Sequence, residues 1–232
     1  MKIHTLLCAL VVLPALCACA SSASQTGTSA ASSAPPVSED GMQLKVHTAN
    51  RLVYLKPGAT FGKYNSVMMT DLFVQFQKDW QRNYNSNVMN PQNQVTDQQM
   101  TQMKQALATE FKRIFTQELQ KGGYQVVTAP GPDVLLLRPA IINLEVTAPD
   151  TMSAGMNANF VTSAGSGTLY LELWDSSTNT ILARVMDAQA DQTPFARQAN
   201  RVTNTQAADI LITGWADELV HHLDAVRGKT GQ

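Results

Sequence analysis

The feature that most constrains the fold is a change of hydrophobic period along the chain: three to four residues, then two, then three to four again. Thr96 and Gln99 form a capping-box pair that opens a predicted helix, and Gly122-Gly123 ends it. The apolar stripe of this helix is Met100, Met103, Leu107, Phe111, Ile114, Phe115 and Leu119. A second helix is expected over 205–227, ended by Gly228. Its stripe is Ala208, Leu211, Ile212, Trp215, Leu219 and Leu223.

Alternating apolar residues and turn signals predict strands in the rest of the domain. The expected strands are 52–55, 66–76, 124–127, 134–146, 168–174 and 181–188. Pro139 predicts that the strand over 134–146 lies at a sheet edge or carries a bulge. Polar residues predict a loop over 83–93, and 151–167 is expected to be a loop leading into a strand. Together these elements predict an α+β fold, with a mainly antiparallel sheet and two long helices packed on one face.

The last two strands should form a hairpin whose register follows from their alternation. The expected pairs are Leu171 with Val185, Leu173 with Ala183, Glu172 with Arg184 and Trp174 with Leu182. In this register Leu171 faces the core. Glu172 is then a structural partner of Arg184, in a pair that should contribute only about 0.2–1 kcal/mol.

The N-terminus has the layout of a secretory signal, with an apolar run over 6–16 followed by small residues. Leu16, Ala18 and Cys19 match the lipobox of bacterial lipoproteins, with cleavage before Cys19. Cys17 is the weaker candidate, and the alternative is an ordinary signal peptide. By this resemblance the mature chain is acylated (with palmitate among its acyl chains) at Cys19, the lipidation site. Ala20, where inner-membrane lipoproteins usually have Asp, favours the outer membrane and a domain in the periplasm.

Three segments follow from this interpretation. Residues 1–18 are a signal peptide, 19–40 are the lipidated cysteine with a flexible Ser/Ala-rich tether, and 41–232 are a single globular periplasmic domain. All three cysteines precede residue 20, so the domain has no thiol for a disulfide or a thiolate metal site. The formal net charge of −1 argues against a nucleic-acid partner, which needs a strongly basic face.

The sequence also resembles a family of bacterial lipoproteins known as domain-of-unknown-function 3313, over roughly residues 52–226. The motifs that carry the resemblance are Leu55-Lys56-Pro57-Gly58-Ala59 with Phe61, Tyr64 and Val67; Ala129-Pro130-Gly131-Pro132-Asp133-Val134-Leu135 with Arg138; and Gly167, Glu172, Asp175 and Asp187. The family has no established activity. The resemblance therefore implies fold and location and adds no catalytic residue.

Patterns that carry catalytic or cofactor chemistry are scarce. The sequence has no HExxH motif, no GxSxG elbow and no glycine-rich loop that opens a helix. We therefore expect no catalytic residue, no metal and no cofactor. The carboxylates that could form an acid/base pair for sugar cleavage are Glu172, Asp175, Asp187 and Asp191. A hairpin with one ion pair and a capped turn explains the same residues.

Two functions remain open. The first is a non-enzymatic lipoprotein, anchored in the membrane by its lipid, that binds an envelope protein or a cell-wall polymer. The second is a cell-wall hydrolase using Glu172 with Asp187 or Asp191. The aromatic residues that could form an exposed binding patch are Phe73, Phe76, Trp80 and Tyr84, although Phe73 is expected to be in the core.

Overall fold

The computed structural model describes residues 34–147, 160–161, 165–190, 197–198 and 201–227. They belong to one compact unit, Ala34–Gln232. The strands are β1 (Gln43–His47), β2 (Arg51–Leu55), β3 (Ser66–Met69), β4 (Phe73–Phe76), β5 (Gln125–Val127), β6 (Val134–Val146), β7 (Phe160–Val161), β8 (Gly165–Asp175), β9 (Thr180–Ala190) and β10 (Arg197–Gln198). The helices are α1 (Trp80–Ser86), the short 3₁₀ helix η1 (Pro91–Asn93), α2 (Asp97–Lys121) and α3 (Arg201–Val226).

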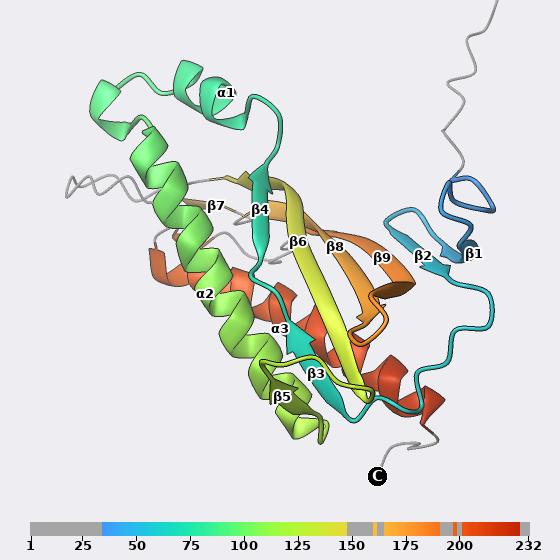
Figure 1. Cartoon of the computed structure of the whole chain (residues 1–232). Coiled ribbons are helices and arrows are strands. Elements are labelled where there is room, and N and C mark those ends of the chain that lie inside the picture. The colour runs from blue at the N-terminus through green and yellow to red at the C-terminus, as the bar shows by residue number, and fades with distance from the viewer. Residues whose placement is uncertain (1–33, 148–159, 162–164, 191–196, 199–200, 228–232) are drawn as a thin grey trace, which may run out of the picture. The chain divides into compact units, whose positions relative to one another are not determined.

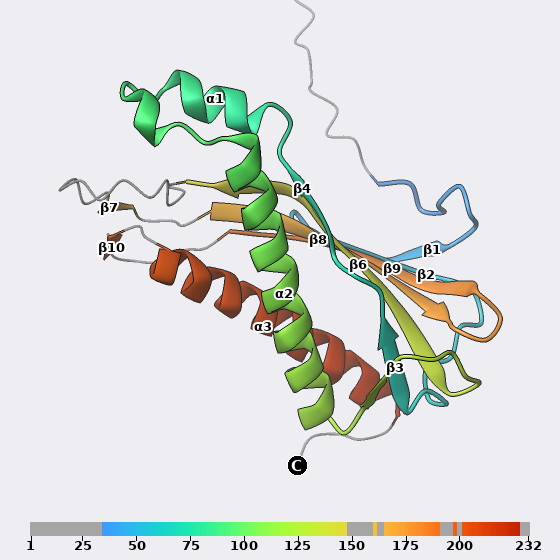
Figure 2. The same ribbon diagram turned by 60° about the vertical axis from the view of Figure 1, so that its left-hand side comes forward.

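The predicted α+β class is confirmed. Within the described residues, eight strands form one sheet in the order β1-β2-β9-β8-β6-β3-β5, with β4 also paired to β6. The sheet is mixed: β3 runs parallel to β5 and β6, and β4 runs parallel to β6, whereas the other pairs are antiparallel. Helices α2 and α3 cross each other on one face of the sheet, as expected (Figure 1, Figure 2).

Helix α2 begins and ends where the sequence predicts. The Thr96 hydroxyl accepts a hydrogen bond from the Gln99 backbone N–H, and the Gln99 side chain accepts one from the Thr96 N–H, which completes the capping box. At the other end Gly123 has φ +79°, a conformation that glycine adopts without strain. The stripe is buried from Phe111 onward, whereas Met100, Met103 and Leu107 are only half-buried.

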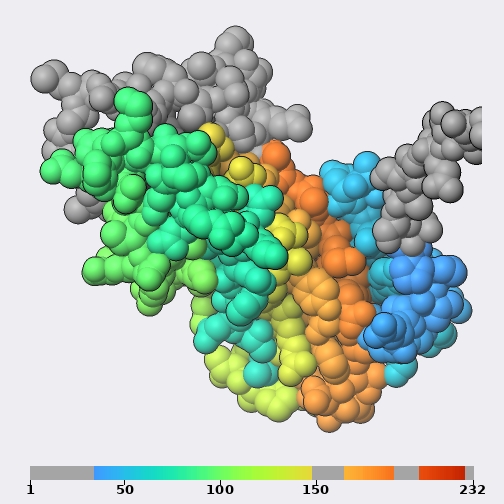
Figure 3. All heavy atoms as spheres, turned by 90° about the horizontal axis from the view of Figure 1, so that it is seen from above, coloured from blue at the N-terminus to red at the C-terminus, as the bar shows by residue number. Residues whose placement is uncertain are grey.

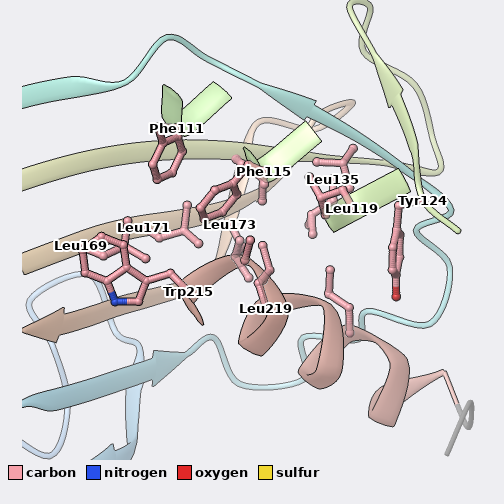
Figure 4. Close-up of a cluster of buried hydrophobic side chains, with 14 of the residues drawn as sticks. Phe111, Phe115, Leu119, Tyr124, Leu135, Leu169, Leu171, Leu173, Trp215 and Leu219 are labelled. Atoms are coloured by element: carbon pink, nitrogen blue, oxygen red, sulfur yellow. The ribbon is translucent and has the colours of Figure 1, made fainter. Parts of the chain in front are cut away.

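The core lies where the C-terminal halves of α2 and α3 meet the sheet (Figure 4). Phe111 and Phe115 of α2 stack with ring centroids 4.0 Å apart. Members of this cluster from the other elements include Leu135, Leu137, Leu169, Leu171, Leu173, Trp215, Leu219 and Leu223. In α3, as in α2, the predicted stripe is less buried near the N-terminus, where Ala208 and Leu211 are half-buried. The predicted stop at Gly228 lies outside the described residues.

Two of the strand predictions are wrong. The expected strand over 66–76 is split into β3 and β4, because β6 pairs first with β3 and then, further along, with β4. Pro139 is not at an edge or a bulge but inside β6, opposite Leu171 of β8. It lies between Leu137, which pairs with β3, and Ala140, which pairs with β4, so its missing N–H falls where β6 changes neighbours.

The expected loop over 83–93 contains helical turns. Helix α1 begins at Trp80, and the side chain of Asn85 within it accepts a hydrogen bond from the Val95 N–H (2.8 Å) and donates one to the Val95 carbonyl (2.9 Å). Trp80 also stacks on Phe76 with a centroid separation of 4.7 Å. The Asn85–Val95 contacts join residues ten positions apart, and the Phe76–Trp80 stacking depends on burial. The polar composition of the segment therefore gave no sign of the helix.

The hairpin register is confirmed over its central part. Leu171 pairs with Val185, Glu172 with Arg184 and Leu173 with Ala183, and Leu171 is buried. The register then shifts by one residue, so Trp174 faces Ile181 instead of the expected Leu182. Leu182 is buried in the core cluster. Leu182 was expected on the opposite face of the sheet, and the register shift turns its side chain toward the core.

Candidate functional site

The predicted site residues fall into two groups. Cys19 and Asp191 lie outside the described residues, as do the signal peptide and most of the tether. Glu172, Asp175 and Asp187 are described, and each has defined neighbours.

Glu172 is the centre of a polar network on the sheet face that α2 and α3 do not cover. Its carboxylate accepts hydrogen bonds from the Tyr170 hydroxyl (2.8 Å), the Trp174 indole N–H (3.1 Å) and Arg184 Nε (3.2 Å). Burial, followed by the contact with Glu172, raises the pKa of Tyr170 to about 12. Arg184 also donates to Asp40 at 2.8 Å. The contact with Arg184 is the structural pairing that the sequence predicts for Glu172.

Asp187 lies on the opposite face of the sheet from Glu172. It pairs with Leu169, whose side chain is in the core, whereas Glu172 alternates with the core-facing Leu171 and Leu173. Asp187 is buried, and this burial raises the pKa of its carboxyl against the opposing effect of Arg51. Since the sheet separates Glu172 from Asp187, these two carboxylates do not form an acid/base pair. The other pair that the hydrolase hypothesis named, Glu172 with Asp191, includes a residue outside the described part of the chain.

Asp175 caps the β8–β9 turn. Its Oδ1 accepts hydrogen bonds from the Ser177 hydroxyl (2.6 Å) and from the backbone N–H groups of Ser177 and Thr178, both at 3.0 Å. Its Oδ2 accepts from Lys63 Nζ (2.6 Å) and the Tyr64 hydroxyl (2.8 Å). The Lys63 contact, followed by Ser177, holds the pKa of this carboxyl far below its usual range. The capped turn was predicted, but the contact with Lys63, over a hundred residues away, had no local signal.

The face that carries Glu172 is the first candidate binding surface. Figure 3 shows β6, β8 and β9 exposed there, between the β3–β4 region and the segment around residue 40. We call this surface the outer face. Its side chains from the four strands are Phe73, Leu136, Arg138, Ala140, Tyr170, Glu172, Trp174, Arg184 and Met186. Phe73 is 60% exposed, so the expectation that it lies in the core is wrong. It pairs with Ala140, whose neighbour Ile141 is the core residue.

The aromatic patch expected from the sequence is divided in two. Phe76 and Trp80 are buried in a small separate cluster with Val95, and Tyr84 stacks on Trp80 with centroids 5.6 Å apart. Phe73 instead belongs to the outer face. There it joins Tyr170 and Trp174, which lie about a hundred residues further along the chain, so sequence proximity grouped it with the wrong aromatic residues.

The second candidate is a cavity of about 850 Å³ between the N-terminal halves of α2 and α3 and the adjoining end of the sheet. Its apolar lining residues are Val95, Met103, Ala106, Leu107, Ile141, Leu144, Val146, Gly165, Gly167, Ala207, Ala208, Leu211, Ile212 and Trp215. Its polar lining residues are Gln99, Gln102, Thr109, Glu110, Glu145, Ser166, Asn204 and Thr205. This cavity was not predicted from the sequence. The available signal was the presence of small residues, Gly167 and Ala208, at positions of the apolar pattern where large ones are expected.

The described part of the chain contains no cluster of His, Cys, Asp and Glu suited to holding a metal ion. None of its helices combines the length and hydropathy of a membrane span.

The fold and these surfaces define an α+β domain with one helix-covered face, one open face and an apolar cavity. Residues 37–219 match the model of a family described as "Protein of unknown function (DUF3313)". The chain belongs to this family, which confirms the resemblance seen in the sequence. No curated protein matches the chain.

Several solved structures are similar in fold. They include the PelC dodecamer from Paraburkholderia phytofirmans (12% identity, TM-score 0.37, covering 71% of this chain and 96% of that one). A minor lipoprotein from Acinetobacter baumannii has 11% identity and a TM-score of 0.32, with 71% and 95% covered. A putative neuraminyllactose-binding hemagglutinin homolog from Helicobacter pylori has 12% identity and a TM-score of 0.33, with 74% and 96% covered.

Proposed function

We propose that this protein is a lipoprotein of the outer membrane, anchored through acylated Cys19, whose periplasmic domain binds another envelope protein without catalysing a reaction. The lipobox-like residues at 16–19 and the Ser/Ala-rich tether support the anchor. Two acyl signals are enough for stable membrane attachment, so a multiply acylated cysteine would need no further anchor.

The observation that carries the binding role is the composition and exposure of the outer face. Phe73 is a large apolar side chain left 60% exposed, beside Ala140. Tyr170 lies in the next strand opposite Ala140, and Met186 is opposite Tyr170. Phe, Tyr, Trp, Met and Arg are the residues enriched in protein–protein interfaces, and all five types occur on this face.

The protein already covers part of this face with its own chain. The Tyr54 hydroxyl donates to the Pro35 carbonyl (2.9 Å), Arg184 bonds Asp40, and Met42 is completely buried. The segment 34–42 therefore packs on the β2–β9 side, while the side near Phe73 and Tyr170 remains open. A polypeptide partner that packs as this segment does would fit the open side, which favours a protein over a cell-wall polymer.

The hydrolase alternative receives less support from the geometry. The four donors around Glu172 leave it in a structural role, and Asp187 lies beyond the sheet. A binding role needs neither carboxylate to be free.

Photocrosslinking in intact cells tests the binding role. A photoreactive phenylalanine analogue at position 73 should give one discrete adduct with another envelope protein, and Tyr170→Ala in the same chain should reduce it. The same analogue at Gln105, which is exposed on α2, is the matched control and should not give that adduct. Equal adducts from both positions, or an adduct with a second copy of this chain, would contradict the proposal. So would retention of the purified chain on peptidoglycan sacculi that Phe73→Ala abolishes, since the partner would then be the polymer.

A further inference from the structure

The cavity exists because small residues replace large ones at facing positions of two elements, β8 and α3. Along the core-facing side of β8, Leu169, Leu171 and Leu173 are preceded by Gly167. A Cβ at Gly167 would lie 3.3 Å from the Ile141 side chain and 3.8 Å from that of Leu144, both in the cavity lining. Facing this position, α3 presents Ala207 and Ala208 where its later turns present Trp215 and Leu219. At this end of the sheet these small residues therefore leave space between the helices and β8.

The cavity has a buried inner end and an open mouth. Ile141, Ile212 and Trp215 are each at most 4% exposed and belong to the core cluster (Trp215 is seen beside β8 in Figure 4). Gln102 and Ala106 of α2 are exposed and mark the mouth. The lining extends along α2 from Gln99 to Glu110, about 16 Å at 1.5 Å per residue. This length suits an extended chain better than a compact ring system.

The charges around the cavity select among apolar ligands. Among the described lining residues none is Lys, Arg or His, and the carboxylate that projects from α2 is Glu110. Glu145 borders the cavity through its backbone, because it pairs with Ser166, which alternates with the core-facing Gly167. Glu110 is paired with Arg113, but Asp209 lies 3.8 Å from the same guanidinium, so the two carboxylates share one cation. An anionic head group at the mouth would therefore meet net negative charge. The Gln102 amide and the side-chain NH₂ of Gln99, whose oxygen caps α2, offer hydrogen bonds to a neutral head group.

We propose that this cavity binds the acyl chain of a neutral single-chain amphiphile of the monoacylglycerol type. Its volume falls in the range of small-molecule sites, roughly 300–1,000 Å³, and its mostly apolar lining with a few polar groups near the opening is typical of them. The inference is independent of the outer face, which lies on the other side of the sheet. It assigns a ligand in addition to the proposed protein partner.

The test uses the mature chain, residues 19–232, carrying Cys19→Ser so that it has no lipid of its own. The neutral fluorescent probe N-phenyl-1-naphthylamine is bound first and then displaced with 1-monolauroylglycerol or with laurate below their micelle concentrations. We expect saturable displacement by monolauroylglycerol, and at least about tenfold weaker displacement by laurate at low ionic strength, because laurate is anionic.

Variants locate the binding. Ala106→Trp at the mouth and Ala208→Phe in the wall should each weaken displacement at least about tenfold, because they fill space that the acyl chain needs. Ala225→Trp, at an exposed position of α3 outside the lining, is the matched control and should bind as the unmodified chain does. Circular dichroism and the unfolding midpoint establish that each variant folds. Phe73→Ala should also bind normally, which separates this proposal from the proposed function.

Several outcomes would overturn the inference. Probe binding that does not saturate, equal affinity in folded Ala106→Trp and in the control, or laurate binding more tightly than monolauroylglycerol would each do so. A chain that is dimeric at micromolar concentration and becomes monomeric in Ala106→Trp would mean that a second copy fills the cavity instead.

Discussion

Arg184 lies directly opposite Glu172 in the β8–β9 hairpin, with its Nε and Nη2 both 3.2 Å from Glu172 Oε1. The same guanidinium reaches Asp40, so one arginine joins the hairpin to the segment that leads from the tether. Both side chains of the pair are largely buried, at 16% and 21% exposure. The carboxylate that most resembled a catalytic acid in the sequence thus stabilises the outer face.

Glu172→Gln should cost about 1–3 kcal/mol in the free energy of unfolding. The amide oxygen can still accept from Tyr170 and Arg184, but the NH₂ group that replaces Oε2 leaves the Trp174 N–H without its acceptor. Urea denaturation measures the cost, with Glu39→Gln, an exposed carboxylate, as the control. The purified mature chain should not digest peptidoglycan. Digestion lost in Glu172→Gln and retained in Glu39→Gln would restore the hydrolase hypothesis.

Leu171→Ala should destabilise the domain by about 2–5 kcal/mol, because its side chain is 2% exposed and its removal leaves a cavity beneath α2 and α3. Phe73→Ala removes an even larger side chain from an exposed position and should change stability by about 0.5 kcal/mol or less. Chemical unfolding of both variants provides the comparison. A larger loss in Phe73→Ala would reverse our assignment of the two faces.

Asp175→Asn tests the pH dependence of the turn. The folded pKa of Asp175 is depressed below the unfolded value of about 3.9, so its ionised form contributes stability that is fully present above about pH 4. That contribution is lost as the pH falls toward the folded pKa. The variant should be less stable than the unmodified chain at pH 7, and the difference should shrink steadily between about pH 4 and pH 2. Asp71→Asn, whose native side chain is 96% exposed, is the control. A difference independent of pH would contradict the mechanism.

Asp187→Asn should affect stability at pH 7 in the opposite direction to Asp175→Asn. Burial raises the pKa of Asp187, so between its unfolded and folded pKa values the folded state binds more protons and stability rises as the pH falls. At pH 7 the variant, which carries no charge to bury, should be at least as stable as the unmodified chain. Its advantage should diminish on acidification through the folded pKa. Denaturation midpoints at pH 7 and pH 5 decide the matter, and a marked loss of stability at pH 7 would show that the contact with Arg51 outweighs burial.

Cys19→Ser should abolish lipidation. Labelled palmitate should enter the unmodified chain but not this variant, which should accumulate as precursor or be released from the membrane. Cys17→Ser should remain labelled, because Cys17 is not the expected cleavage site. Continued membrane attachment and labelling of Cys19→Ser would refute the proposed anchor.

Features that depend on local period and local hydrogen bonds could be predicted from the sequence. Helix α2 has its capping box at Thr96 and its stop after Lys121, and the hairpin pairs Glu172 with Arg184, as their spacing predicts. Such features arise within one or two adjacent elements, where the side-chain period fixes which face is buried.

Which distant segments become neighbours depends on the tertiary packing of whole elements. β6 exchanges β3 for β4 at Pro139, and this places Phe73 on the outer face beside Tyr170. The cavity likewise requires Gly167 and Ala208, distant in sequence, to meet where α2 and α3 diverge. No local sequence pattern predicts these long-range contacts, because they depend on how complete elements pack against one another. A side chain gains or loses packing free energy only when its neighbours are in place.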